Sequence, residues 1–261
     1  MKIATWNVNS VRSRLDHVVN WLKDNPVDVL CLQETKVVDT DFPRSEFAAL
    51  GYHIYIYGQK SYNGVALLSK KPLEQVTTGF TSILTDIDPI WDEQKRVITG
   101  VIDGIRILNL YVPNGSEVGS EKYNYKLGWL TVLRQYLETL LSITPNICMC
   151  GDFNIALEDK DIHEKATNIK NHIMSSDAER QALKEILKLD FTDAFRKFTE
   201  EGGHFTWWDY RTAGFAKNRG WRIDHHYLTP QLYSSATSCI IDIELRKLEK
   251  PSDHTPVIVQ F

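Results

Sequence analysis

The chain lacks long hydrophobic runs, since no more than four apolar residues follow one another anywhere in its 261 residues. A membrane-spanning helix needs about 20 consecutive apolar residues, so the sequence predicts no transmembrane segment and no membrane partner. The N-terminal residues, which begin Met1-Lys2-Ile3, also lack the apolar stretch of a signal peptide. We therefore expect an unsecreted, cytoplasmic protein.

Cysteine is scarce, with only four residues of this type: Cys31, Cys148, Cys150 and Cys239. Each lies in an apolar, strand-like stretch, which favours buried free thiols in a reducing compartment. Cys148-x-Cys150 has no second Cys or His pair at zinc-binding spacing. The sequence therefore predicts no zinc site at these cysteines.

An excess of positive charge is also missing, since the net charge is −4. This argues against a protein that coats polyanions in general, although it is compatible with a local basic groove. Hydrophobic content of 43% and charged content of 25% are typical of a globular protein. Neither a linker nor a low-complexity tract interrupts the chain, so we interpret residues 1–261 as a single domain.

The hydrophobic pattern predicts strands in several consecutive runs, with helices between them. Leu15 to Leu22 and residues 121–142 show helical spacing, and Ser176 with Glu179 forms a capping box that opens a helix through Leu189. Asp103-Gly104 is a strong hairpin turn signal. The predicted strands cover 2–8, 27–33, 52–57, 64–69, 96–102, 105–111, 147–150, 222–228, 236–243 and 256–261. This order indicates two packed sheets with helices outside.

One strand ends in an acid and an amide, in Gly151-Asp152-Phe153-Asn154. Residues two apart in an extended chain point to the same side, so Asp152 and Asn154 are expected to be aimed together. A carboxylate and an amide placed in this way suit a metal ion, a phosphate or an attacking water. An ordinary turn after a strand is the alternative.

Polar residues also stand at the ends of the other predicted core strands. Oxygen-rich clusters with few thiols suit Mg²⁺ or Mn²⁺, and such a cluster can assist the attack of water on a phosphoryl group. Taken singly, each residue is also explained as a surface acid, an ion-pair partner or part of a turn. The set consists of Asn7, Asn9, Glu34, Tyr111, Asn114, Asp152, Asn154, Asp224, Asp253 and His254.

These segments, in this order, resemble the exonuclease III family of abasic-site DNA endonucleases, within the endonuclease/exonuclease/phosphatase superfamily. The resemblance runs through nearly the whole chain. It implies an α/β (α+β) fold, a four-layer sandwich of two packed mixed β-sheets flanked by helices. The matching segments are residues 6–14, 32–36, 111–115, 151–154, 218–224 and 251–256.

The resemblance implies a Mg²⁺ cofactor, with Mn²⁺ as an alternative. Glu34 would be the main metal ligand, and Asn7 would lie close to it. Asp253 would reach the metal or brace His254. The metal group implied in this way comprises Asn7, Glu34, Asp152, Asn154, Asp253 and His254.

The resemblance also implies catalytic roles. Asp152 would orient or deprotonate the attacking water, and Asn154 would hydrogen-bond the nucleophile or the developing charge. Tyr111 would donate to the phosphate or assist the leaving group. His254 would contact the phosphate, with Asp224 fixing its tautomer. Whether Asp152 or the His254–Asp224 pair is the general base stays open at this point.

The implied substrate is double-stranded DNA with abasic or 3′-blocked lesions, bound by a monomer. Trp207, Trp221 and Ile223 would line a pocket that admits a bare deoxyribose and excludes a base. Core packing is the alternative for the tryptophans, and a solvated face is the alternative for any one basic residue. Residues expected to meet the DNA are Asn114, Lys36, Arg219 and Arg222.

The predicted activity is Mg²⁺-dependent hydrolysis of the phosphodiester 5′ to an abasic site, leaving a 3′-hydroxyl. A 3′-5′ exonuclease or 3′-phosphodiesterase activity is expected beside it. One alternative is a superfamily phosphatase or phosphodiesterase acting on lipid or inositol phosphates, which need not have Trp207, Trp221 and the basic Asn218-to-Arg222 run. A second alternative is a non-catalytic DNA-binding relative, which gaps in the catalytic set would favour, and the sequence shows no such gap.

Overall fold

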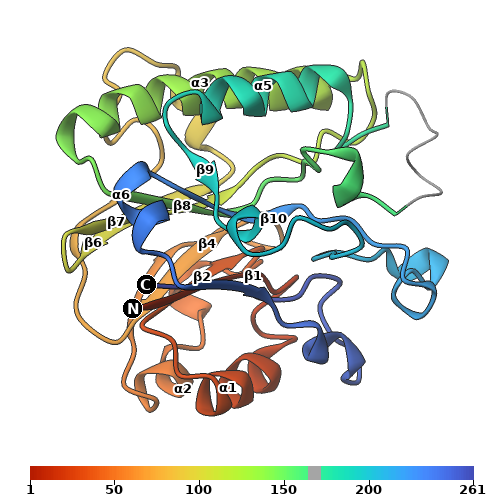
Figure 1. Cartoon of the computed structure of the whole chain (residues 1–261). Coiled ribbons are helices and arrows are strands. Elements are labelled where there is room, and N and C mark those ends of the chain that lie inside the picture. Colours follow the sequence, from red (N-terminus) through yellow and green to blue (C-terminus); the bar gives the residue numbers. More distant parts are fainter. Residues whose placement is uncertain (164–171) are drawn as a thin grey trace.

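The structure, a computed structural model, describes residues 1–163 and 172–261. Two six-stranded sheets pack face to face, and helices cover their outer faces (Figure 1). The first sheet has the order β11 (Ser238–Ile241), β12 (Val257–Gln260), β1 (Lys2–Asn7), β2 (Val29–Gln33), β4 (Val65–Ser69) and β3 (His53–Tyr57). The second has the order β5 (Glu74–Thr78), β6 (Val97–Ile102), β7 (Ile105–Tyr111), β8 (Ile147–Asp152), β10 (Asp224–Leu228) and β9 (Thr192–Asp193). The predicted four-layer sandwich is confirmed.

Each sheet contains one parallel pair, β1 with β2 and β7 with β8, and the remaining pairs are antiparallel. A parallel pair needs a crossover connection, and a helix supplies it each time. Helix α1 (Leu15–Asp24) joins β1 to β2, and α3 (Glu121–Ile143) joins β7 to β8. This arrangement brings the carboxyl ends of β1 and β2, and those of β7 and β8, to one edge of each sheet.

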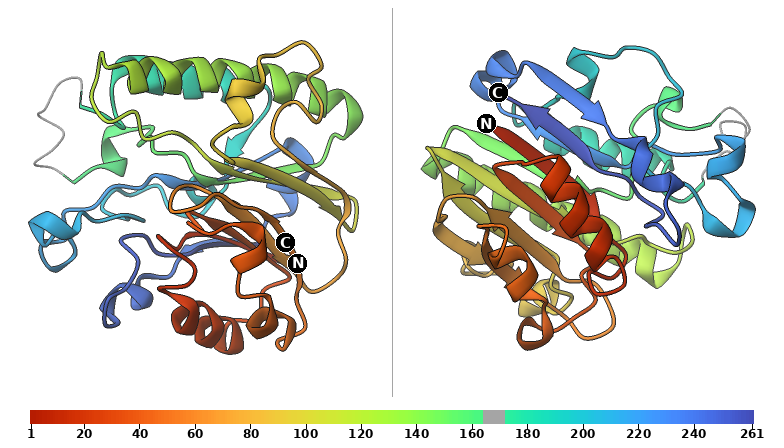
Figure 2. Two further views of the ribbon diagram at one scale, coloured as in Figure 1. Left: turned by 180° about the vertical axis from the view of Figure 1, so that it is seen from behind. Right: turned by 90° about the horizontal axis from the view of Figure 1, so that it is seen from below.

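The central core lies between the two sheets and contains all four cysteines. Two further cores lie outside the sheets. Helices α3 and α5 (Asp177–Leu187) pack on the second sheet, and α1 and α2 (Arg44–Ala48) pack on the first (Figures 1 and 2). The predicted capping box is present, since Ser176 Oγ accepts from the Glu179 amide while Glu179 Oε2 accepts from the Ser176 amide. The two chain ends meet, because the Met1 ammonium donates to the Phe261 carbonyl.

Among the described α-helices and β-strands, four lie outside the predicted set: β5, β9, α2 and α6 (Pro230–Ser235). Strand β5 reads Glu-Gln-Val-Thr-Thr and is partly exposed at a sheet edge, and β9 has only two residues, so neither has a strong apolar alternation. Within residues 1–163 and 172–261, no helix has the length and apolar character to cross a bilayer.

Candidate active site

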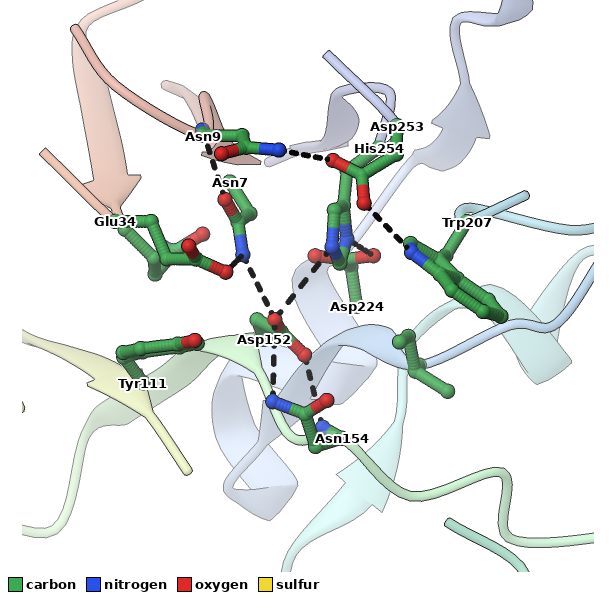
Figure 3. A network of polar contacts seen from close by, with 12 residues as sticks. Asn7, Asn9, Glu34, Tyr111, Asp152, Asn154, Trp207, Asp224, Asp253 and His254 are labelled. Atoms are coloured by element: carbon green, nitrogen blue, oxygen red, sulfur yellow. Dashed lines mark hydrogen bonds and ion pairs between the residues drawn. The ribbon is translucent and has the colours of Figure 1, made fainter. Parts of the chain in front are cut away.

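The ends of five core strands meet at one edge of the sandwich. Asn7 ends β1, and Glu34 follows β2 directly. Tyr111 and Asp152 end the parallel strands β7 and β8 and are paired in register. Strand β10 runs antiparallel to β8, so its first residue, Asp224, lies opposite Asp152. The segment before β12 brings Asp253 and His254 to the same place (Figure 3).

Gly151 is needed because two strands approach too closely there for a side chain. Its φ is +139°, and an added Cβ would lie 1.9 Å from the Leu110 carbonyl oxygen of the neighbouring strand β7. Any side chain would push β7 and β8 apart directly beside Asp152. Gly151 therefore sets the spacing that holds Asp152 next to Tyr111.

The relation between Asp152 and Asn154 differs from the prediction of two residues in extended chain. Asn154 has a left-handed φ of +49°, and its backbone amide donates to Asp152 Oδ1 at 2.8 Å. This is a turn in which the aspartate accepts from the residue two positions on. The turn bends the Asn154 side chain back toward the carboxylate, with Nδ2 at 3.4 Å from Asp152 Oδ2. The turn that was the alternative interpretation is therefore present, and it still brings the two side chains together.

Glu34 and Asp152 are joined by one amide group. Asn7 Nδ2 donates to Glu34 Oε1 and to Asp152 Oδ2, both at 2.9 Å. The Asn7 oxygen accepts from the Asn9 backbone amide, which fixes the amide orientation. Glu34 itself has a φ of +50°, an unfavourable conformation for a residue with a Cβ, and such strain is found at functional sites.

A lysine balances the charge of Glu34. Lys36 Nζ lies 2.8 Å from Glu34 Oε2 and donates to Asn9 Oδ1 at 2.6 Å. Burial raises the pKa of Glu34, but the charge of Lys36 and the hydrogen bond from Asn7 outweigh it and hold the pKa below its usual value. Glu34 is therefore ionised at neutral pH. Lys36, predicted to meet DNA, contacts the acidic centre itself.

His254 lies between two aspartates. Its Nδ1 donates to Asp224 Oδ2 at 2.9 Å, and its Nε2 lies 3.7 Å from Asp152 Oδ2. Burial lowers the pKa of His254, but the charges of Asp224 and Asp152 outweigh it and raise the pKa to about 10. Burial raises the pKa of Asp152 to about 7, against the opposing charge of His254. The geometry thus gives an imidazolium held by Asp224 next to a carboxylate that exchanges protons near neutrality.

Asp253 is positioned by two side chains on either side of it. Asn9 Nδ2 donates to its Oδ1 at 2.9 Å, and Trp207 Nε1 donates to its Oδ2 at 3.0 Å (Figure 3). Burial raises the pKa of Asp253, but the charge of His254 and these two hydrogen bonds bring it below its usual value. Asp253 is therefore a second ionised group at the edge of the site.

The donor set at the centre suits a hard divalent cation. Ligand atoms of Glu34, Asp152 and His254 all lie within 4.8 Å of one another, and carboxylate oxygens are the donors that such ions prefer. The other residues predicted for the metal are oriented differently. Asn7 turns its Nδ2 toward the carboxylates, and Asn154 Oδ1 accepts from Asn114 Nδ2 at 3.0 Å. Asp253 lies outside the group of three.

Tyr111 is held under the site by a residue that the sequence did not indicate. Arg96 donates to the Tyr111 carbonyl at 3.0 Å, and its guanidinium lies 4.5 Å from the centre of the Tyr111 ring. Burial and the nearby Glu34 charge raise the pKa of Tyr111 well above its usual value. The phenol is therefore a proton donor at neutral pH.

A buried lysine fixes the loop after β8. Lys126 Nζ donates to the Asn154 carbonyl at 2.8 Å and to the Asn114 carbonyl at 3.2 Å, and it pairs with Glu179 of α5. Both members of the pair are fully buried. The sequence carried a signal for Lys126, because this charged residue stands four positions before Leu130 on the apolar face of α3.

The residues predicted for a sugar pocket lie together beside His254. Trp221 and Ile223 are buried in one apolar cluster, and Trp207 packs against it from a partly exposed position. Trp207 forms isolated β-bridges with both Trp221 and His254. The neighbouring Trp208 is buried in the core. The cluster thus forms an apolar wall next to the polar centre.

Arg222 does not face the solvent, and its prediction as a DNA contact is wrong. Its guanidinium is buried and donates to Asp161 and Asp193, each at 2.7 Å. The buried carboxylates of Asp161 and Asp193 hold this side chain inside the protein. Arg219, three positions earlier, is partly exposed, and Asn114 is exposed at the rim. For these two residues and for Lys36, contact with DNA stays a prediction.

The sequence matches the family model described as Endonuclease/Exonuclease/phosphatase family over residues 4–254. It is 34% identical over 272 aligned residues to the exodeoxyribonuclease III of Haemophilus influenzae, covering 100% of both proteins.

Two solved structures have the same fold over nearly their full length. One is an AP endonuclease from Archaeoglobus fulgidus, with a TM-score of 0.92 and 42% identity, covering 100% of this chain and 99% of that one. The other is a 3′ phosphatase from Neisseria bound to product DNA hairpin, with a TM-score of 0.94, 38% identity and the same coverage. The similarity therefore includes the strand ends that carry the site.

Proposed function

Because the chain belongs to the Endonuclease/Exonuclease/phosphatase family, we propose that its acidic centre hydrolyses the phosphodiester 5′ to an abasic site in duplex DNA and leaves a 3′-hydroxyl. The coarser activity follows from its relatives: the chain is a hydrolytic DNA repair nuclease. The observation that carries the finer proposal is the apolar wall of Trp207, Trp221 and Ile223 directly beside His254. Such a wall accepts a sugar without a base next to the reacting phosphate.

Nucleases of this family depend on a divalent metal ion, and the chain has acidic groups able to hold one. We assign the ion as Mg²⁺, with Mn²⁺ as a substitute, because the ionised donors are carboxylates. Glu34 and Asp152 would hold it, while His254, as an imidazolium, is a donor and a poor ligand. When bound, the ion neutralises charge on the phosphoryl oxygens.

The protein's own groups account for water activation. Asp152 accepts hydrogen bonds from Asn7 Nδ2 and from the Asn154 backbone amide, so its carboxylate is held in one orientation at the centre of the site. A water hydrogen-bonded to Asp152 would attack the phosphorus and pass its proton to this carboxylate. We therefore assign Asp152, rather than the His254–Asp224 pair, as the base.

Two groups meet the charge that develops on the phosphate. His254 is cationic and is held in place by Asp224, so it contacts the phosphoryl oxygens as a preorganised donor. Tyr111 keeps its proton at neutral pH and lies on the opposite side of Asp152, where it donates to the phosphate or the leaving oxygen (Figure 3). Losing one such donor typically costs about 3 kcal/mol of transition-state stabilisation.

A second activity at the same centre is supported by the likeness to the 3′ phosphatase from Neisseria. We expect removal of 3′-blocking groups, because a terminal phosphate and an internal phosphodiester present the same phosphoryl oxygens to His254 and Tyr111. We propose that the protein acts on DNA as a monomer. We also propose that it acts in the cytoplasm.

The test is incubation of the protein with a duplex that carries one abasic-site analogue, with Mg²⁺ or with chelator. We expect metal-dependent incision 5′ to the lesion, and a parallel duplex with a 3′-phosphate measures the second activity. Asp152→Asn should bind the duplex and lose about 10³-fold in cleavage rate. Folded protein that cleaves neither duplex with Mg²⁺ or Mn²⁺ would exclude the proposal. Undiminished cleavage by Asp152→Asn would exclude the role of Asp152.

A further inference from the structure

A second group of metal-binding side chains lies inside the protein, in the core between the sheets. Within residues 1–163 and 172–261, three side chains outside the acidic centre bring their donor atoms within 4.8 Å of one another. They are Cys148 and Cys150 of β8 and His226 of β10, and all three are buried. We propose that these three residues bind a thiophilic divalent cation of the zinc class.

The strand register explains why the three side chains meet. Cys148 and Cys150 are two positions apart on β8, so both point to the same face of the sheet. His226 lies directly opposite Cys150 in the antiparallel pair of β8 and β10. All three therefore project from one sheet toward the other. A zinc pattern in the sequence would need a second Cys or His pair close to Cys148 and Cys150. None is present there, and for this reason the sequence predicted no zinc site.

The histidine has the proton arrangement of a metal ligand. His226 Nε2 lies 3.0 Å from the Val257 carbonyl oxygen of β12. A carbonyl only accepts, so Nε2 carries the proton and Nδ1 presents its lone pair. Ligating histidines typically donate their other ring N–H to such a group, which fixes the tautomer and the ring orientation. Nδ1 points at Cys148 Sγ.

The spacing matches zinc coordination. Cys148 Sγ and His226 Nδ1 are 3.6 Å apart. Zinc bonds of about 2.3 Å to sulfur and 2.0 Å to nitrogen at a tetrahedral angle place these atoms about 3.5 Å apart. This pair of ligand atoms would therefore need little movement when the thiols lose their protons to the solvent and the ion binds, and Cys150 Sγ lies within 4.8 Å of both.

Charge favours a divalent ion over a monovalent one. Two thiolates and one neutral imidazole carry a charge of −2, which a divalent cation cancels, and a neutral group is tolerated in a dry core. Cys31 of β2 lies against Cys150 from the other sheet and is the nearby candidate for a fourth donor. An ion here would join β8 to β10 two residue pairs inward from Asp152 and Asp224.

The test is zinc uptake by the whole protein, refolded with and without Zn²⁺ because the ligands are buried. Saturating Mg²⁺ and a Glu34→Gln background exclude binding at the acidic centre. After competition with a weak chelator we expect about one Zn²⁺ per chain. The ion should be lost in Cys148→Val and His226→Phe and retained in Cys239→Val, which removes another buried cysteine of the same core.

A second measurement uses the protein without substitution at the ligands, in case a core variant misfolds. Co²⁺ in place of Zn²⁺ should give the sulfur-to-metal charge-transfer absorption of a thiolate site, and bound Zn²⁺ should raise the Tm. Absence of both signals in protein refolded with metal would overturn the proposal. Zinc retention by folded Cys148→Val and His226→Phe would do the same.

Discussion

Nδ1 of His254 donates a 2.9 Å hydrogen bond to Oδ2 of Asp224, and both side chains are buried. The two residues are 30 positions apart, one before β12 of the first sheet and one at the start of β10 of the second. The bond therefore fixes the position of the imidazole relative to both sheets. It also raises the pKa of His254, so this contact determines both the orientation and the charge of the group that meets the phosphate.

Asp224→Asn should lower kcat by about 10²- to 10⁴-fold with little change in KM, because an amide no longer stabilises the imidazolium in this orientation. Loss of the carboxylate also lowers the pKa of His254, so the alkaline limb of the pH–rate profile should move to lower pH. Steady-state kinetics on the abasic duplex over a range of pH measures both effects. An unchanged alkaline limb would contradict a role for Asp224 in the charge of His254.

Glu34→Gln should raise the Mg²⁺ concentration for half-maximal activity by about tenfold or more, because an ionised ligand becomes a neutral amide. Chelator should abolish the activity of the wild-type protein, and added Mg²⁺ should restore it. The measurement is a metal titration of incision. Glu46→Gln, an exposed carboxylate on α2, is the matched control and should behave as wild type. Equal midpoints for the two variants would remove Glu34 from the metal site.

His225 should make the protein less stable in acid. Burial first, and then the charge of Arg222, lower the pKa of His225 from 6.5 to about 4. The unfolded chain therefore binds more protons between these two values, and the free energy of unfolding falls as pH drops through this window. The loss reaches about 3 kcal/mol near the lower value.

Urea unfolding of wild type and His225→Gln at a series of pH values tests this. Glutamine does not titrate but can still donate and accept hydrogen bonds, so the variant should lack this part of the acid loss. Both proteins contain the same carboxylates, so the difference between their free energies of unfolding cancels the contribution of these groups. Parallel curves for both proteins between pH 6.5 and about 4 would show that His225 is not the group responsible.

Arg222→Met should lower the free energy of unfolding by about 3–5 kcal/mol, because it leaves Asp161 and Asp193 as buried charges without this partner. Arg219→Met, a partly exposed loop position, should change stability by less than about 0.5 kcal/mol. Denaturant unfolding compares the two.

DNA affinity should depend more on Arg219 than on Arg222, the reverse of the order expected for stability. Arg219→Met should weaken DNA binding and reduce its salt dependence, since a phosphate contact is lost. We assign Arg222 to stability and Arg219 to DNA binding. If Arg222→Met and Arg219→Met lowered the free energy of unfolding by similar amounts, and Arg219→Met left DNA affinity unchanged, this assignment would be wrong.

Local patterns in the sequence determined the sheets, the main helices and the motif residues. Apolar alternation, the Asp103-Gly104 turn and the Ser176 capping box depend only on neighbouring residues, and such features appear directly in the order of amino acids. The motif segments at the strand ends, in their order along the chain, also carried the resemblance to the family. Short edge elements such as β9 carried too little pattern to be predicted.

Only the tertiary structure decided which distant side chains meet and which way they face. Arg222 stands in a basic run but turns inward, because Asp161 and Asp193 lie beneath it. His226 meets Cys148 across 78 residues, and Lys126 reaches the loop of Asn154 from a helix. Such contacts depend on strand register and on the spacing of the two sheets, which no local pattern specifies. The sequence thus named the groups of the acidic centre, and packing determined their charges, their orientation and the thiol cluster beneath them.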